Sequence, residues 1–105
     1  MSTVVTLLFP VPSAGAEAFD SDYYINKHLP LGLKAWSKYG LGKWSIIKLN
    51  PETGYVMQTI MVWESAEAQA LAMKEAGAEL LGDMKNFTTE KPLVVPGVSA
   101  AGDLI

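Results

Sequence analysis

A chain of 105 residues, half of them hydrophobic, has the size of one domain, so we expect residues 1–105 to fold as a single unit around one core. The net charge of −3 and the absence of arginine argue against a nucleic-acid-binding role. The absence of cysteine excludes disulfides, thiolate catalysis and cysteine-based metal sites. Neither a basic leader nor an apolar run of membrane-spanning length is present, so we expect a cytoplasmic protein without a membrane partner.

The first part of the chain predicts a strand and then an interrupted helix. Residues 4–9 form a short apolar run closed by prolines, which is typical of a buried strand. Asp20 is well suited to cap a helix, and Pro30 disfavours helical geometry at the residue before it. We therefore expect a break at Pro30, followed by a second helical piece over residues 31–39 that ends at Gly40.

The middle of the chain predicts a hairpin with two apolar faces. Residues 43–50 and 55–63 are predicted to be strands, joined by a turn over the Asn-Pro-Glu-Thr-Gly cluster at 50–54. Both alternating faces of residues 55–63 are largely apolar, whereas an open sheet face is normally polar. Two helices cover only one face of a sheet, so we expect a second copy of the chain to cover the other. The alternative is that long side chains and the tail shield that face.

The last part of the chain predicts a long helix and a final strand. Residues 64–81 are rich in strong helix formers, with Ser65 as the N-cap and Gly82 as the stop. A loop at 83–87 then leads to a strand at 91–98. The order is βαββαβ, which predicts an α+β, ferredoxin-like fold with a four-stranded antiparallel sheet and two helices on one face.

Two stretches resemble signatures of the EthD family (ethyl tert-butyl ether degradation protein-like). Residues 19–31 read FDSDYYINKHLPL, and residues 83–88 read DMKNFT, similar to an Asp-x-x-Asn-Phe-Thr stretch before the last strand. Trp63, which closes the third strand before a Glu-Ser pair, also fits, whereas Lys85 stands where related sequences have proline. The resemblance implies a homodimer of the dimeric α/β-barrel type, with a pocket between sheet and helices in each subunit. It also implies a place in degradative or polyketide-type pathways.

His28 is the candidate catalytic residue. It is the only histidine, and histidine alone has an unperturbed pKa near neutrality. Asp20, Tyr24 and His28 follow one another at intervals of four residues, so they share a helical face. The expected break before Pro30 would place His28 at a helix C-terminus, where the helix dipole favours a cation. Asp83 is the candidate partner that orients it for acid/base catalysis.

Structural alternatives remain open for each of these residues. A lone histidine near a kink often only binds backbone carbonyls, and Asp83 could instead cap a turn. One of the adjacent tyrosines is expected in the core and the other at the cavity, with Tyr24 favoured for the cavity because it shares a face with His28. Tryptophans, Trp63 included, more often pack in cores or interfaces. The candidate substrate-binding residues are all aromatic: Tyr23, Tyr24, Trp63 and Phe87.

The favoured function is a cofactor-independent enzyme acting on a hydrophobic carbonyl or phenolic compound. His28 would transfer a proton, Asp83 would orient it and Tyr24 would hydrogen-bond the substrate oxygen, in a cyclisation, isomerisation, decarboxylation or oxygenation. No metal or cofactor is expected, because one histidine with scattered carboxylates lacks ligand spacing. A non-catalytic carrier of a hydrophobic intermediate is the alternative, and a structural assembly subunit is a third reading.

Overall fold

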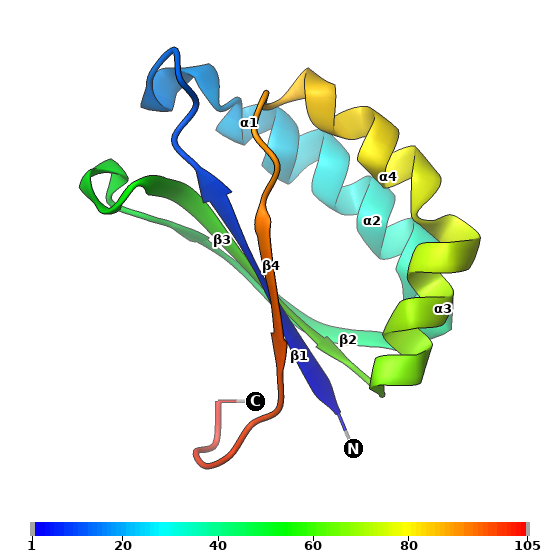
Figure 1. Ribbon diagram of the computed structural model, residues 1–105. Coiled ribbons are helices and arrows are strands. Elements are labelled where there is room, and N and C mark those ends of the chain that lie inside the picture. The colour runs from blue at the N-terminus through cyan, green and yellow to red at the C-terminus, as the bar shows by residue number, and fades with distance from the viewer. Residues whose placement is uncertain (1, 105) are drawn as a thin grey trace.

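The computed structural model describes residues 2–104 and shows a twisted sheet with two helical arms packed against it (Figure 1). The strands are β1 (Thr3–Pro10), β2 (Leu41–Lys48), β3 (Tyr55–Trp63) and β4 (Leu93–Gly97). The helical segments are η1 (Ala16–Ala18), α1 (Ser21–Tyr23), η2 (Tyr24–His28), α2 (Leu29–Trp36), η3 (Ser37–Tyr39), η4 (Pro51–Thr53), α3 (Ala66–Ala76), α4 (Ala78–Asp83) and η5 (Met84–Asn86).

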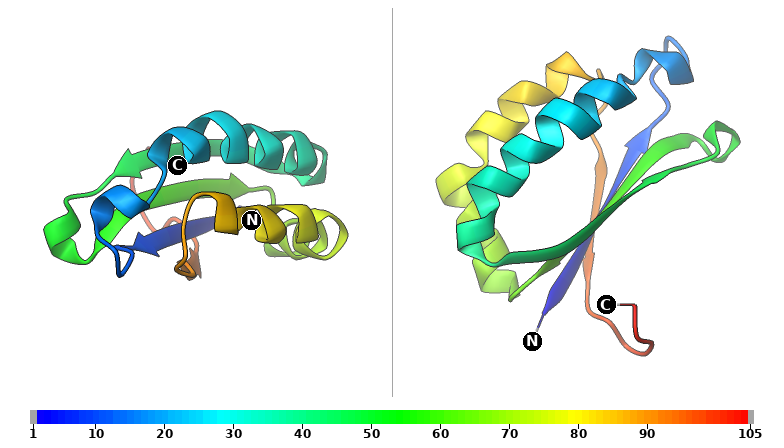
Figure 2. Two further views of the ribbon diagram at one scale, coloured as in Figure 1. Left: turned by 90° about the horizontal axis from the view of Figure 1, so that it is seen from above. Right: turned by 180° about the vertical axis from the view of Figure 1, so that it is seen from behind.

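The sheet has the strand order β2-β3-β1-β4, and every neighbouring pair is antiparallel. The arm α1–α2 and the arm α3–α4 lie on the same face of it (Figure 2). The fold is therefore α+β and ferredoxin-like, and the predicted hairpin is β2 and β3. These predictions are confirmed.

The inner face of the sheet, beneath the helices, carries two apolar clusters of buried side chains. The aromatic cluster comprises Phe9, Phe19, Tyr24, Val56, Met57 and Phe87. The tryptophan cluster comprises Val5, Trp36, Met61, Trp63, Ala72 and Leu80. Because alternate residues of a strand point to opposite faces, β1 and β3 each supply side chains to both clusters from alternate positions. Val56 joins the aromatic cluster next to Met57 because the register of β1 and β3 shifts there.

The first helical arm is continuous, and the expected break at Pro30 is wrong. Asp20 caps its start as predicted, with its side chain accepting a hydrogen bond from the Tyr23 N–H. The segment η2 is a π-helical turn, in which the Leu29 N–H bonds to the Tyr24 carbonyl five residues earlier. A π-turn is a wider local geometry within a helix, and Pro30, which has no N–H to donate, directly follows this turn as the second residue of α2. His28 therefore lies inside a helix and not at a helix C-terminus, so the expected stabilisation of its cation by the helix dipole does not apply.

The second arm begins as predicted but divides at an unexpected glycine. The Ser65 side chain caps α3 by accepting from the Ala68 N–H at 3.0 Å. The helix is interrupted at Gly77, where an added Cβ would lie 2.4 Å from the Met73 carbonyl oxygen. Only glycine fits such a close approach. Gly82, the predicted stop, lies inside α4 instead, so Asp83 ends a helix and is not in a loop.

The outer face of the sheet is apolar and has no covering layer within residues 2–104. Leu93 and Val95 of β4 are 50% and 44% exposed, and Ile47 of β2 is 39% exposed. The tail leaves most of this face open: residues 98–101 only border a hollow beside Val4 and Thr6, and Leu104 borders one over β2 and β3 and is itself exposed. No helix among these residues combines the length and apolar character needed to cross a bilayer.

Candidate functional site

The structure brings His28 and Asp83 together across the two helical arms. His28 ends the π-turn η2 and Asp83 ends α4, and the His28 Nδ1 lies 2.8 Å from the Asp83 Oδ2. Their side chains are 12% and 14% exposed, so the pair is largely shielded yet reachable. Because 55 positions separate the two residues, only the packing of α4 beside the first arm creates this contact.

The Asp83 carboxylate has two further donors on its other oxygen. Its Oδ1 accepts from the Tyr23 hydroxyl at 2.6 Å and from the Asn86 amide at 2.8 Å. Partial burial alone would raise the pKa of Asp83, but the hydrogen bonds from Tyr23, His28 and Asn86 outweigh it and hold that pKa below its usual value. The hydrogen bond to Asp83 raises the pKa of Tyr23, because it favours the protonated phenol.

Aromatic rings enclose the imidazole of His28. Tyr24 stacks on it with ring centroids 5.5 Å apart and an interplanar angle of 19°. Phe87 lies at 4.6 Å and is tilted against it. The Tyr24 hydroxyl hydrogen-bonds the Thr59 hydroxyl on β3, and burial raises the pKa of Tyr24 to about 12. The rings fix the orientation of His28 and limit its contact with water.

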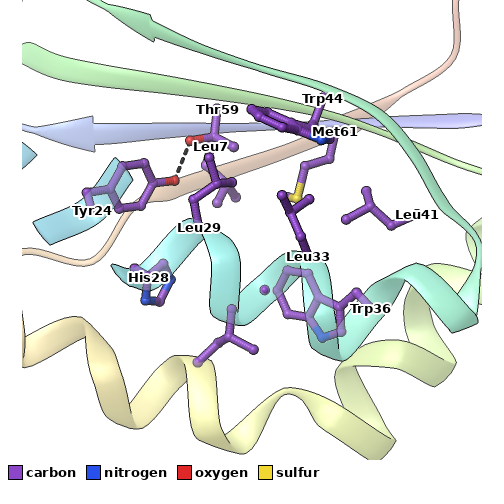
Figure 3. A pocket seen from close by; sticks show the side chains of 12 residues that line it. Leu7, Tyr24, His28, Leu29, Leu33, Trp36, Leu41, Trp44, Thr59 and Met61 are labelled. Carbon is purple, nitrogen blue, oxygen red and sulfur yellow. Dashed lines mark hydrogen bonds between the residues drawn. The ribbon is translucent and has the colours of Figure 1, made fainter. Parts of the chain in front are cut away.

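A small apolar cavity of about 40 Å³ lies beside the histidine, between α2 and the inner face of the sheet. Figure 3 shows His28 and Tyr24 at one end of it and Trp36, Trp44 and Leu41 at the other. The hydroxyls of Tyr24 and Thr59 at its wall are bonded to each other, and most of the remaining lining is apolar. The cavity is therefore suited to an apolar group.

The predicted site residues divide into three sets. His28 and Tyr24 line the cavity, as the shared helical face suggested. Tyr23 and Phe87 touch the pair from outside the cavity, Tyr23 through Asp83 and Phe87 through the His28 ring. Trp63 is 0% exposed in the tryptophan cluster and does not line the cavity.

Other residues at this site were not singled out from the sequence. Asn86 follows Asp83 by three residues, a spacing that lets both side chains meet on a short helical turn, and this signal could have identified it. Trp36, Trp44 and Thr59 line the cavity, but their positions depend on how α2 and the strands pack. Among residues 2–104, no group of three or more potential metal-ligating side chains gathers in one place.

No known family model matches this sequence, and no curated protein matches it. Solved structures do. An EthD-like protein from Ralstonia eutropha JMP134 aligns with a TM-score of 0.84 at 22% identity, covering 98% of this chain and 96% of its own. An EthD family protein from Bacillus halodurans C-125 aligns with a TM-score of 0.74 at 22% identity, covering 94% and 99%. This chain has the EthD-like fold.

The EthD-like fold extends to proteins of less similar sequence. SnoaB from Streptomyces nogalater, a cofactor-independent oxygenase, aligns with a TM-score of 0.62 at 12% identity, covering 96% of this chain and 94% of its own. The fold expected from the sequence motifs is confirmed by these alignments.

Proposed function

We propose that this chain is a cofactor-independent enzyme that moves a proton on a hydrophobic small molecule, with His28 as the acid/base group. The observation that carries the proposal is the 2.8 Å contact between His28 Nδ1 and Asp83 Oδ2, beside a cavity that His28 itself lines. A histidine held by a carboxylate at one ring nitrogen can exchange a proton with a substrate at the other. The oxygenase of the same fold supports small-molecule chemistry without a cofactor.

The reaction begins with the removal of a proton from a phenolic hydroxyl or from a carbon next to a carbonyl. The proton passes to the free nitrogen of His28, and the bonding electron pair stays on the substrate as a phenolate or enolate. Asp83 offsets the charge of the imidazolium that forms. Return of the proton at another carbon gives isomerisation, and attack on an internal carbonyl gives cyclisation. In a decarboxylation, loss of carbon dioxide from a β-keto carboxylate forms the enolate directly, and a protonated His28 then delivers the proton to carbon. Oxygenation requires dioxygen as the oxidant.

Tyr24 and Thr59 can assist at the substrate oxygen. The two hydroxyls hold two protons between them but share one hydrogen bond, so one O–H remains for another acceptor. The pKa of about 12 keeps Tyr24 protonated at neutral pH, as a donor must be. The pair is thus placed to hold an enolate oxygen beside His28.

The cavity limits how a substrate enters. Its 40 Å³ is far below the roughly 300–1,000 Å³ of ordinary ligand pockets. Only a short apolar end of the substrate fits inside, unless side chains move. Trp44 borders the cavity from the edge strand β2 and is 44% exposed, so it is the side chain that can yield to a larger ligand.

The working form in this proposal is a homodimer that joins the outer faces of two sheets. The exposure of apolar residues such as Leu93 and Val95 in the single chain supports a dimer that buries them, because monomers rarely expose a large contiguous apolar patch. Sedimentation of wild type and of Ile60→Lys, with Leu81→Lys on the helical side as control, tests it. A dimer lost only in Ile60→Lys supports the proposal, and a monomeric wild type contradicts it.

Membership of the EthD family, a degradative or polyketide-type pathway and a cytoplasmic location belong to the same proposal.

Hydrogen–deuterium exchange tests the catalytic part directly. Small aryl ketones in deuterated buffer are incubated with the protein, and loss of the proton next to the carbonyl is followed by NMR. Wild type should accelerate exchange, and His28→Ala should lower the rate about 10²–10⁴-fold, the usual effect of losing a general base. Lys74→Gln, an exposed position on α3, serves as the folded control and should match wild type.

The same samples separate the enzyme from a carrier. A carrier would bind ketones or phenols, seen as shifts of the His28 ring resonances, without accelerating exchange. In that case His28→Ala would weaken binding only by about 1 kcal/mol, the scale of one hydrogen bond. A protein whose His28 resonances respond to none of the compounds would contradict both functions and favour a structural role.

A further inference from the structure

Both oxygens of the Asp83 carboxylate are in hydrogen-bond contact with neighbouring side chains. Oδ2 faces the His28 Nδ1 at 2.8 Å, while Oδ1 receives the Tyr23 hydroxyl at 2.6 Å and the Asn86 amide at 2.8 Å. The Asn86 amide also reaches the Tyr23 oxygen at 3.3 Å, so the two donors support each other. Hydrogen bonds to the charged form of a carboxylate favour that form, and the lowered pKa of Asp83 agrees. Asp83 is therefore an acceptor on every side.

An ionised Asp83 decides where the proton of a neutral His28 resides. A neutral imidazole carries one N–H, and the nitrogen that faces a carboxylate must be the one that donates. The proton is then on Nδ1, and Nε2 carries a lone pair. Among residues 2–104, no hydrogen-bond partner for Nε2 is present. Nε2 is thus free to accept a hydrogen bond from a ligand.

We infer that Tyr23 and Asn86 are positioning residues that lock neutral His28 as an acceptor at Nε2, so that the site selects ligands with an acidic O–H, phenols or enols, over ethers of the same shape. This inference rests on the proposed function, because it assigns a ligand class to the same cavity. The three contacts on Asp83 carry it, together with the absence of a hydrogen-bond partner for Nε2 among residues 2–104. An ether oxygen directed at Nε2 would meet a lone pair and be repelled.

The tautomer of His28 tests the lock without any ligand. Nitrogen-15 NMR of the single histidine distinguishes Nδ1–H from Nε2–H, at a pH above the measured titration midpoint of each variant. Wild type should be mainly Nδ1–H, and Tyr23→Phe and Asn86→Ala should each raise the share of Nε2–H. Tyr55→Phe, a tyrosine for which the structure shows no hydroxyl hydrogen bond, should leave the tautomer unchanged. A mainly Nε2–H wild type, or a tautomer unmoved in Tyr23→Phe, would overturn the inference.

A matched ligand pair tests the selection. 4-Methylphenol and 4-methylanisole differ by one methyl group on the oxygen, and both can be titrated against the His28 resonances. The phenol should bind at least about tenfold more tightly, the factor that corresponds to one hydrogen bond of ~1.4 kcal/mol. Tyr23→Phe should narrow this ratio, and Tyr55→Phe should keep it.

The outcomes separate this inference from the proposed function. Equal binding of the two ligands to wild type would overturn the selection while leaving a ligand site in place. Absence of any response to either ligand would count against the proposed function, and the tautomer measurement would still decide the role of Tyr23. A mainly Nδ1–H wild type with a clear phenol preference supports both.

Discussion

The aromatic cluster and the tryptophan cluster lie on the same face of the sheet, yet their buried polar atoms differ in whether they have hydrogen-bond partners. At the aromatic end, the buried hydroxyl of Tyr24 is bonded to Thr59, and the His28–Asp83 pair with its further donors lies against the rings. At the other end, the Trp36 N–H reaches the Ala76 carbonyl, but the Trp63 N–H has no partner among residues 2–104. Side-chain hydrogen bonds are concentrated around the His28–Asp83 pair, whereas apolar packing dominates the opposite end.

The largest expected effect is the loss of packing in the tryptophan cluster. Trp63 is fully buried, and its ring is tilted against that of Trp36 with the centroids 5.6 Å apart. Trp63→Ala should therefore lower the free energy of unfolding by about 3–5 kcal/mol, measured by denaturant titration. Trp63→Phe should cost less, because it also removes an unpaired N–H. In whatever fraction stays folded, the His28 tautomer should be unchanged. A loss below about 1 kcal/mol for Trp63→Ala would contradict the packing role.

The next largest effect is expected from the loss of the buried hydrogen bond between Tyr24 and Thr59 in the aromatic cluster. Thr59→Val leaves the buried Tyr24 hydroxyl without its partner and should cost about 1–3 kcal/mol in the free energy of unfolding. The double variant Thr59→Val/Tyr24→Phe removes both polar groups and should recover much of that loss, which denaturant titrations of all four proteins would show. Strictly additive losses would indicate that the hydroxyl pair contributes nothing as a pair.

A smaller effect is expected at the cap of α3, which covers the tryptophan cluster. Ser65→Ala removes the hydrogen bond to the Ala68 N–H and should lower stability by about 1 kcal/mol, seen as a reduced Tm. Ser65→Asp should restore it, because aspartate caps equally well. The His28 resonances should not respond to either change. A response would mean that the two ends of the sheet are coupled.

The smallest effect concerns acid stability at the aromatic end. The pKa of Asp83 is lower in the folded chain than its ordinary value of 3.8, so its contribution to stability is present above pH 3.8 and is lost as the pH falls through the folded pKa. Asp83→Asn should therefore flatten the pH dependence of the free energy of unfolding below about pH 4. Glu79→Gln, an exposed carboxylate on the same helix, is the control. Identical acid profiles for Asp83→Asn and wild type would contradict the assignment.

The sequence was a good guide to elements that local chemistry determines. Strand patterns, the turn at residues 50–54 and the caps Asp20 and Ser65 depend on neighbours along the chain, and all are found in the structure. The contact between His28 and Asp83 required the fold as well, since the motif resemblance only suggested that the two segments meet.

The errors come from features that depend on packing. The rule for the residue before a proline treats one dipeptide, whereas Pro30 follows a widened turn that keeps the helix intact. Gly77 and Gly82 look alike within a run of helix formers, and the close approach to Met73 distinguishes them only in three dimensions. Trp44 reaches the cavity because β2 shifts its register against β3 between Leu41 and Trp44, which no local pattern predicts.

The π-turn at Tyr24–His28 has a consequence for insertions and deletions in this chain. Such a turn contains one more residue than a regular helical turn needs. Deleting that residue would restore regular α-helical winding and rotate the preceding residues of the helix by about 100° around its axis, relative to α2. Tyr23 would swing away from Asp83 while His28 kept its place. Homologues one residue shorter here would therefore keep the histidine and lose the tyrosine contact, so alignment gaps at this turn mark a change of chemistry.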